Sequence, residues 1–265
     1  MPNLSRFFYS STYSWHHDTR DSFHGECDLV LLHSDSFQED TGLDVHIRTT
    51  MQADGLYSYI EAAAVRIGET ILEFNSRLFR LNGVEHDYDP TFSFTFEEQG
   101  HTYKVSSTTI KEHKRETTIE LNEGSSIKIR SSKELMYVSF EGGRAEFGDS
   151  VGMLGDYKTG EMIGRFGVFT EEDYVSYGFE WQVDPTKNDP VLFSEHREPQ
   201  LPYEKCRIPD DTASTKRRRL GATNSKLHEQ AVEACKGASA DIDLCVLDVM
   251  ATGDIDAAEM FVGMI

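Results

Sequence analysis

The segment SIKIRSSKELMYVSF, residues 126–140, decides which class of fold this chain adopts. Two isoleucines alternate with polar residues, a short polar stretch follows, and Met136, Val138 and Phe140 then resume the two-residue period. Successive side chains of a β-strand point to opposite faces of a sheet, so each half of the segment has one apolar face. The segment therefore predicts two antiparallel strands that share a core face and are joined by a turn.

The same period recurs from residue 27 to about residue 147, and glycines separate the runs at turn spacing. Helical periods are missing from this part of the sequence. The pattern favours two antiparallel sheets packed face to face, or a flattened barrel, over an α/β fold. We interpret the chain as mainly β, an antiparallel β-sandwich with a small C-terminal α-helical unit. The expected runs are residues 27–33, 43–51, 62–74, 92–98, 101–110, 117–123, 125–132 and 135–143.

The segments that flank these runs have other compositions. Residues 1–22 are expected to be partly irregular. The proline-rich segment 184–204 is expected to wrap the sandwich as extended chain, because proline lacks the amide donor that a central strand needs. Residues 207–224 are small, polar and basic, which predicts an exposed linker. Residues 225–265 form the helical unit.

Helix signals define this C-terminal unit. A first helix is expected to begin at a cap on Asn224 or Ser225 and to stop at Gly237. A second should start near Asp241 and a third after Asp254. The sequence ends in the apolar MFVGMI, from which we expect the natural chain to continue.

The charge balance limits the partners. There are 46 Asp and Glu against 26 Lys and Arg, a formal net charge of −20. Such a surface repels nucleic acid and anionic lipid and favours cations or basic partners. We expect no membrane insertion, because the apolar stretches are short, and the first residues carry no visible signal peptide.

Several pieces of the chain together resemble a von Willebrand factor type D domain, in a cysteine-poor variant similar to those of unicellular algae. The resemblance covers residues 15–260 and assigns residues 23–206 to the type D domain and the tail to a partial cysteine-containing helical module. The matching pieces are FHGECDLVLLH (23–33), GLDVHIRT (42–49), AAAVRIGETILE (62–73), VGMLGDYKTG (151–160), YGFEWQV (177–183) and EACKGASADIDLCVLDVMATGDIDAA (233–258).

The resemblance implies a disulfide between Cys27 and Cys206. Leu154 stands where a second family bridge would have its loop cysteine, and the cysteine that would be its partner before Cys27 is also missing. Cys235 and Cys245, one in each helix, would form a local second bond. Disulfides indicate an oxidising compartment. The alternative is four buried thiols in a cytosolic protein.

The loop GMLGDYKTG, residues 152–160, is similar to the family's calcium loop. The resemblance implies Asp156 as a ligand, with Asp18 upstream, and calcium as the candidate cofactor. Calcium takes six to eight oxygen ligands, and Lys158 would place a positive charge among them. We favour a structural turn whose glycines supply unusual backbone angles. A phosphate loop is disfavoured, because Tyr157 stands where glycine must precede the lysine.

Other motifs leave alternatives open. The run KRRR predicts a processing site after Arg219, a nuclear signal or a solvated charged segment. Glu180, with Glu171 or Glu172, could form the carboxylate pair of a glycoside hydrolase. Trp181 could stack on a sugar but at strand spacing is more typical of a core residue.

His24 and Glu26, close to the segment WHHD, have no spacing typical of a metal site. We expect these histidines to be solvated.

The function expected from the resemblance is a non-enzymatic, extracellular or cell-surface module for adhesion or matrix assembly. Its partners would be matrix or cell-surface proteins or polysaccharide, with homo-oligomers as a candidate assembly and nucleic acid excluded. The competing interpretations are a polysaccharide-active hydrolase and an intracellular acidic domain that binds a basic partner.

Overall fold

The computed structural model describes both backbone and side chains for most of the chain between residues 23 and 261. The described ranges are 23–52, 55, 57–87, 91–111, 114–170, 174–197, 206–210, 225–237 and 242–261, together with 3–8 and 11–12. For residues 3–8, 11–12, 87, 111, 243, 244, 247, 251, 259 and 260 the description covers the backbone alone.

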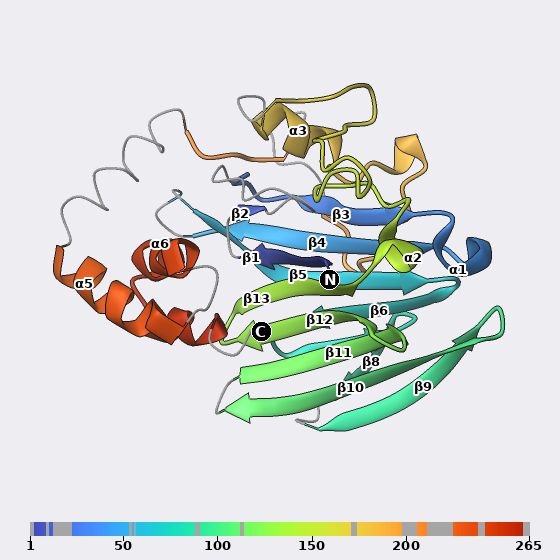
Figure 1. The fold of residues 1–265 in the computed structure, drawn as a ribbon, viewed down its shortest axis with the longest axis horizontal. Helices are drawn as coiled ribbons and strands as arrows, with labels where there is room; N and C mark the ends of the chain where they lie inside the picture. Colours follow the sequence, from blue (N-terminus) through green and yellow to red (C-terminus); the bar gives the residue numbers. More distant parts are fainter. Residues whose placement is uncertain are drawn as a thin grey trace.

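Thirteen described strands form one curled antiparallel sheet, or half-barrel (Figure 1). The expected mainly β, antiparallel fold is confirmed, and its two facing layers belong to a single sheet. The main path runs β8-β7-β6-β5-β13-β12-β11-β10-β9, with β4 and β3 beside β5, and β1 and β2 beside β13. The strands are β1 (Asn3–Phe8), β2 (Ser11–Thr12), β3 (Asp28–Ser34), β4 (Leu43–Met51), β5 (Ser58–Ile67), β6 (Thr70–Asn75), β7 (Leu78–Leu81), β8 (Val84–Asp87), β9 (Phe92–Glu98), β10 (His101–Lys111), β11 (Lys114–Asn122), β12 (Ser125–Ser132) and β13 (Leu135–Gly142).

The segment 126–140 forms the expected hairpin, β12 and β13. Ile127 lies opposite Phe140 and Ile129 opposite Val138, and all four side chains are buried. This row belongs to the concave face of the curled sheet, where the main apolar cluster lies. The sequence period therefore identified the core face of this hairpin correctly.

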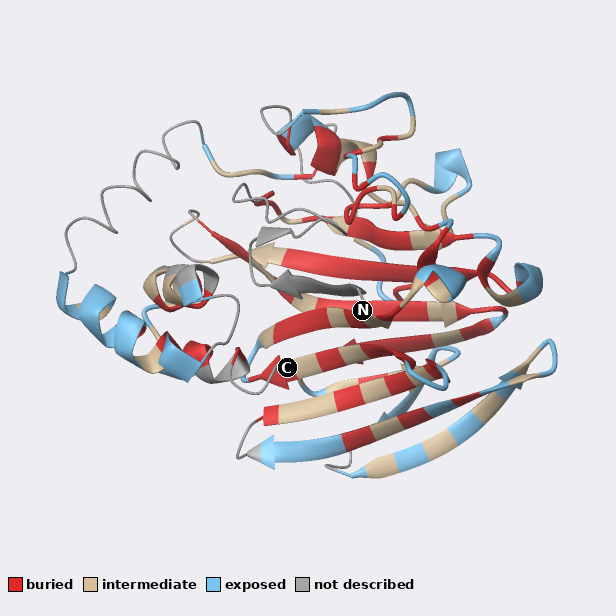
Figure 2. Cartoon of the chain, viewed as in Figure 1, coloured by how far each residue is buried: buried red, intermediate tan, exposed pale blue. Residues whose placement is uncertain are grey.

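The two ends of the sheet path approach each other across this core. The ring of Phe79 on β7 stacks on Phe92 and Phe94 of β9, with centroids 5.3 and 5.7 Å apart. At the other end of β9, Thr70 donates a 2.6 Å hydrogen bond to Glu98. Burial is most continuous on the central strands and alternates along β9, as Figure 2 shows. The curl thus closes the core without hydrogen-bonding β8 to β9.

Two loop segments cover the outer edge of β3. Residues 151–154 run along it, with Met153 N donating to Val30 O at 3.0 Å. Residues 181–183 do the same farther along the strand, where Val183 N donates to Asp28 O at 2.8 Å. The edge of β3 is therefore closed to a further strand.

The proline-rich segment begins with a short 3₁₀ helix, η2 (Pro185–Lys187). The chain after η2 crosses the convex face of β4–β6 in an extended conformation. Leu192 and Phe193 bury themselves against Ala62 and Ala64 there. The expected wrapping as extended chain is confirmed for residues 188–197, whereas residues 185–187 form η2 and 198–204 lie outside the described residues. We call residues 188–197 the strap.

The described helices are short. Three lie near the loops beside the sheet: α1 (Phe37–Asp40), α2 (Arg144–Phe147) and α3 (Tyr174–Glu180). The C-terminal unit holds α5 (Ser225–Ala234), η3 (Cys235–Gly237), α6 (Ile242–Thr252) and η4 (Ile255–Met260), close to the boundaries expected from the sequence. Within the described ranges, none of the helices has the length and apolar character needed to cross a membrane.

The helical unit packs on one end of the sheet (Figure 1). Phe261 meets Tyr137 of β13 edge to face, with ring centroids 5.9 Å apart, and Leu135 and Tyr59 complete the contact. Lys133, in the β12–β13 turn, forms an ion pair with Asp254. An apolar contact and an exposed ion pair thus hold the unit in place.

Candidate functional site

The loop 152–160 is fixed by the strand beside it. Leu154 N donates to Leu31 O, and the hydroxyl of buried Tyr177 donates to Gly152 O. Leu154 and Met153 are themselves buried in the main core. The loop is therefore part of the folded framework, and its position depends on β3 and α3.

Three glycines give this loop its shape. Gly152, Gly155 and Gly160 have φ angles of 137°, 83° and 73°, which L side chains rarely adopt. A Cβ atom at Gly152 would lie 2.5 Å from Leu31 O, and one at Gly155 would lie 2.7 Å from Glu161 O. The unusual glycine angles that we expected of a structural turn are confirmed.

Asp156 caps the turn. Its Oδ1 accepts a 2.8 Å hydrogen bond from Thr159 N, and its carbonyl accepts another from Gly160 N at 2.8 Å. Lys158 turns to Asp149, with which it forms an ion pair, and this pair lowers the pKa of the Asp149 carboxyl. The Lys158 ammonium group, which the sequence placed among the candidate calcium ligands, therefore lies against the Asp149 carboxylate.

Calcium at this loop stays a prediction. Asp18, the expected upstream ligand, lies outside the described residues. Within the part of the chain that the structure describes, nowhere do three His, Cys, Asp or Glu side chains gather as metal ligands would. The described oxygens around Asp156 account for a turn and do not by themselves make a calcium shell.

Cys27 and Cys206 form a disulfide, with Cα atoms 5.3 Å apart and a sequence separation of 179. The bond joins the start of β3 to the chain that follows the strap. Glu26 N donates to Arg207 O at 2.8 Å beside it, and Cys206 N donates to Gln182 at 3.2 Å. Both cysteines are buried. The pairing agrees with the one that the family resemblance implied.

Cys235 and Cys245 form the second disulfide, with Cα atoms 5.7 Å apart. It joins η3 to α6 inside the helical unit, and both side chains are buried in the unit's own cluster. All four cysteines of the sequence are therefore paired. Each bond lies within one of the two structural parts of the chain.

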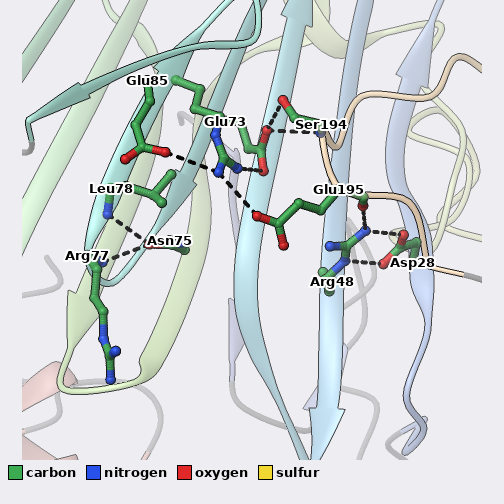
Figure 3. A network of polar contacts seen from close by, with 10 residues as sticks. Asp28, Arg48, Glu73, Asn75, Arg77, Leu78, Glu85, Ser194 and Glu195 are labelled. Atoms are coloured by element: carbon green, nitrogen blue, oxygen red, sulfur yellow. Dashed lines mark hydrogen bonds and ion pairs between the residues drawn. The ribbon is translucent and has the colours of Figure 1, made fainter.

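A polar network on the convex face escaped the sequence analysis (Figure 3). The guanidinium of Arg48 binds both carboxylate oxygens of Asp28, at 2.7 and 2.8 Å, and donates to the Glu195 carbonyl at 2.7 Å. It also lies 4.4 Å from the ring centroid of Phe193. Arg48 thus joins β3 and β4 to the strap. It does so through charge-assisted hydrogen bonds and a cation–π contact.

A second part of the network lies farther along the same face. Buried Glu73 accepts two hydrogen bonds from Ser194, from its amide at 3.0 Å and from its hydroxyl at 2.7 Å. Arg80 bridges Glu73 and Glu85, at 3.0 and 3.2 Å. The register places these three residues side by side on β6, β7 and β8. Pairing across strands is not visible in a linear pattern, so the network could not be predicted from the sequence.

Asp44 organises the other end of β4. Its carboxylate contacts Arg66 and accepts a 2.7 Å hydrogen bond from His33 Nδ1. The hydrogen bond raises the pKa of His33. Burial acts to raise the pKa of Asp44, but the contacts with His33 and Arg66 outweigh it and lower that pKa. Both shifts favour the charged forms of the two side chains.

The remaining candidates fall in different environments. Trp181 is a core residue, as favoured, and its Nε1 donates to Ile163 O at 3.2 Å. His24 is buried against Tyr57, and its Nδ1 accepts from Ser58 N, so the expectation of a solvated histidine was wrong. The cause is packing that the isolated motif does not reveal.

Two candidates remain untested. Glu180 lies at the end of α3, and its suggested partners, Glu171 and Glu172, lie outside the described residues. Arg219, the expected processing site, also lies outside them.

No protein-family model matches the chain, and no curated protein matches it.

Proposed function

We propose that this chain is a non-enzymatic extracellular or cell-surface module for adhesion or matrix assembly, of the von Willebrand factor type D kind. The Cys27–Cys206 bond carries the proposal, because two residues so far apart in sequence are joined where the resemblance requires. Stable disulfides are typical of oxidising compartments.

The surface chemistry supports a basic or cationic partner. The chain carries a formal charge of −20. Exposed carboxylates lie on both structural parts, such as Asp35 and Glu85 in the sheet part and Glu229 and Glu233 on α5. Such a charge attracts basic partners through long-range electrostatics, and this attraction weakens as the salt concentration rises. We expect a matrix protein or a polysaccharide with cationic groups.

The first experiment tests the compartment. Native protein is alkylated before lysis and then digested without reduction, and the peptides are identified by mass spectrometry. The proposal requires one linked pair containing Cys27 and Cys206 and another containing Cys235 and Cys245. Alkylated thiols at all four positions would instead favour the intracellular acidic domain.

The second experiment tests the activity. Binding of the oxidised chain to an immobilised cationic polysaccharide, a neutral glucan and a basic matrix protein is measured at rising ionic strength. Binding to a cationic surface that weakens with salt supports the proposal. Cleavage of the glucan, lost in Glu180→Gln, would favour the hydrolase, and absence of binding to every surface would count against adhesion.

A further inference from the structure

Among the described strands, β9 ends the sheet path and pairs with β10 alone. In Figure 1 it lies at the lower rim of the fold, beyond β10. Its register with β10 is continuous from Phe92 to Glu98, whereas the β3–β4, β4–β5, β10–β11 and β11–β12 pairings all contain a shift. A regular, unbulged edge strand is a ready partner for another strand.

The hairpin turn fixes which backbone groups of β9 point outward. Gln99 and Gly100 both have positive φ, at 48° and 85°, as a two-residue type I′ turn requires. In such a turn the residues on either side, here Glu98 and His101, face each other as a hydrogen-bonded pair. Because such pairs alternate along an antiparallel ladder, Phe96 and Phe94 also bond to β10.

The amide and carbonyl groups of Ser93, Thr95 and Glu97 therefore point away from the sheet. All three residues are exposed, and their outward groups have no partner among the described residues. The side chains of Ser93 and Thr95 are small and uncharged. This edge contains neither lysine nor proline, and its charged residues, Glu97 and Glu98, lie at one end of the strand.

The sequence of β9 is complementary to itself. In an antiparallel pair centred on Thr95, Thr95 faces its own copy and Ser93 faces Glu97. The acidic residues lie at one end of the strand, so this register sets each of them opposite an uncharged residue. On the inner face Phe94 would lie opposite Phe96, and both rings are half-buried in the single chain.

We infer that β9 is a self-association edge, on which β9 of a second copy pairs antiparallel about Thr95 and extends the sheet across the dimer. One strand pair buries less surface than a standard protein–protein interface, so the dimer is weak and concentration-dependent. Two copies that each carry a charge of −20 repel, so added salt strengthens the dimer. The inference is independent of the proposed adhesion function, since it concerns only the edge of the sheet.

Substitutions at Ser93 give the sharpest test, because each copy contributes one Ser93–Glu97 contact. Ser93→Lys sets opposite charges face to face twice, and Ser93→Glu sets like charges face to face twice. Sedimentation equilibrium should show the dimer tightened about fivefold by the first change and weakened about fivefold by the second. Ser176→Lys and Ser176→Glu, on the exposed face of α3, make the same changes in net charge away from β9 and should leave the dimer nearly unchanged.

Chemical cross-linking tests the register. The disulfides occupy all four natural cysteines, so an introduced cysteine is the sole free thiol. In the proposed dimer the two Thr95 Cα atoms lie about 5.5 Å apart, whereas the two Ser93 Cα atoms are separated by about 14 Å. A short bis-maleimide should link Thr95→Cys into a dimer and leave Ser93→Cys monomeric.

Thr95→Pro removes the outward amide at the two-fold axis without removing a bond to β10, and it should abolish the dimer. Thr95→Val retains the amide and is its control; unchanged thermal unfolding verifies the fold of both. A wild-type chain that stays monomeric at high salt and several hundred micromolar would overturn the inference. So would a dimer that survives Thr95→Pro, or equal cross-linking of the two cysteine variants, because either result places the interface elsewhere.

Discussion

His46 lies fully buried on β4, between the outward-facing residues Asp44 and Arg48, and within the described residues neither of its ring nitrogens has a hydrogen-bond partner. Burial lowers the pKa of this imidazole from 6.5 to about 4, although Asp44, Asp189 and Asp28 act in the opposite direction. The strap covers this part of the convex face and excludes the water that would otherwise stabilise the cation. His46 is therefore neutral in the folded chain at neutral pH.

The fold should lose stability in acid because of His46. As pH falls from 6.5 towards 4, the unfolded chain binds a proton that the folded chain does not. The loss approaches about 3 kcal/mol at pH 4. Urea unfolding measured at pH 7, 5.5 and 4.5 should show a smaller decline in His46→Leu than in the wild type. His228→Gln, at an exposed position on α5, serves as control. Parallel curves for His46→Leu and the wild type would contradict this account.

At the scale of one loop, Gly152 should not tolerate a side chain. Gly152→Ala sets a Cβ against Leu31 O and imposes a strained φ, so we expect a destabilisation of about 2 kcal/mol or more. Gly167→Ala, at a position with open space, should change the free energy of unfolding by less than about 0.5 kcal/mol. Chemical denaturation measures both, and equal effects would mean that the loop adapts freely.

The strap depends on a few polar contacts of the convex face. Arg48→Ala removes the pair with Asp28, the bond to the Glu195 carbonyl and the stacking on Phe193, and it leaves Asp28 unpaired. We expect a loss of about 2–4 kcal/mol and faster amide exchange in the strap.

Arg77→Ala is the matched control for this change. Arg77 pairs with Glu134 at 3.4 Å with both side chains well exposed, so it should cost less than about 1 kcal/mol. If amide exchange in residues 188–197 stays slow in Arg48→Ala, the apolar pair Leu192 and Phe193 suffices to hold the strap.

The elements show what a linear pattern can and cannot predict. The expected runs 43–51, 92–98 and 125–132 coincide with β4, β9 and β12, because apolar and polar residues alternate along much of each run. The short strands β7 and β8 were missed, since exposed Val84 and the charged partners Arg80 and Glu85 give no apolar period. Their pairing depends on register with β6, which is non-local.

In the candidate site, too, local features could be predicted from the sequence and non-local ones could not. The glycine angles of the loop and the core role of Trp181 follow from local sequence. The burial of His46 does not, because the alternation places it on the polar face of β4, and only the strap, more than a hundred residues later, covers it. The strand β1 was likewise missed, since it pairs with the distant β13.

At the scale of the molecule, the two disulfides should contribute unequally. On the chain-entropy account, closing the long loop between Cys27 and Cys206 is worth about 5 kcal/mol and the short one between Cys235 and Cys245 about 3 kcal/mol. Replacing each pair by serine and following thermal unfolding should lower the melting temperature of the sheet in the first variant. The second should loosen the helical unit alone. An unchanged sheet in the first variant would contradict the ranking.

Neither disulfide spans residues 211–224, although all four cysteines are used. Should the chain be cut after Arg219, the halves would be held only by contacts such as those of Tyr137 with Phe261 and of Lys133 with Asp254. An intramolecular junction with a fixed effective concentration would then become a bimolecular equilibrium. Dilution would release the helical unit and expose the aromatic end of β13. Hydrolysis of a single peptide bond would thus make the contact between the helical unit and the sheet reversible.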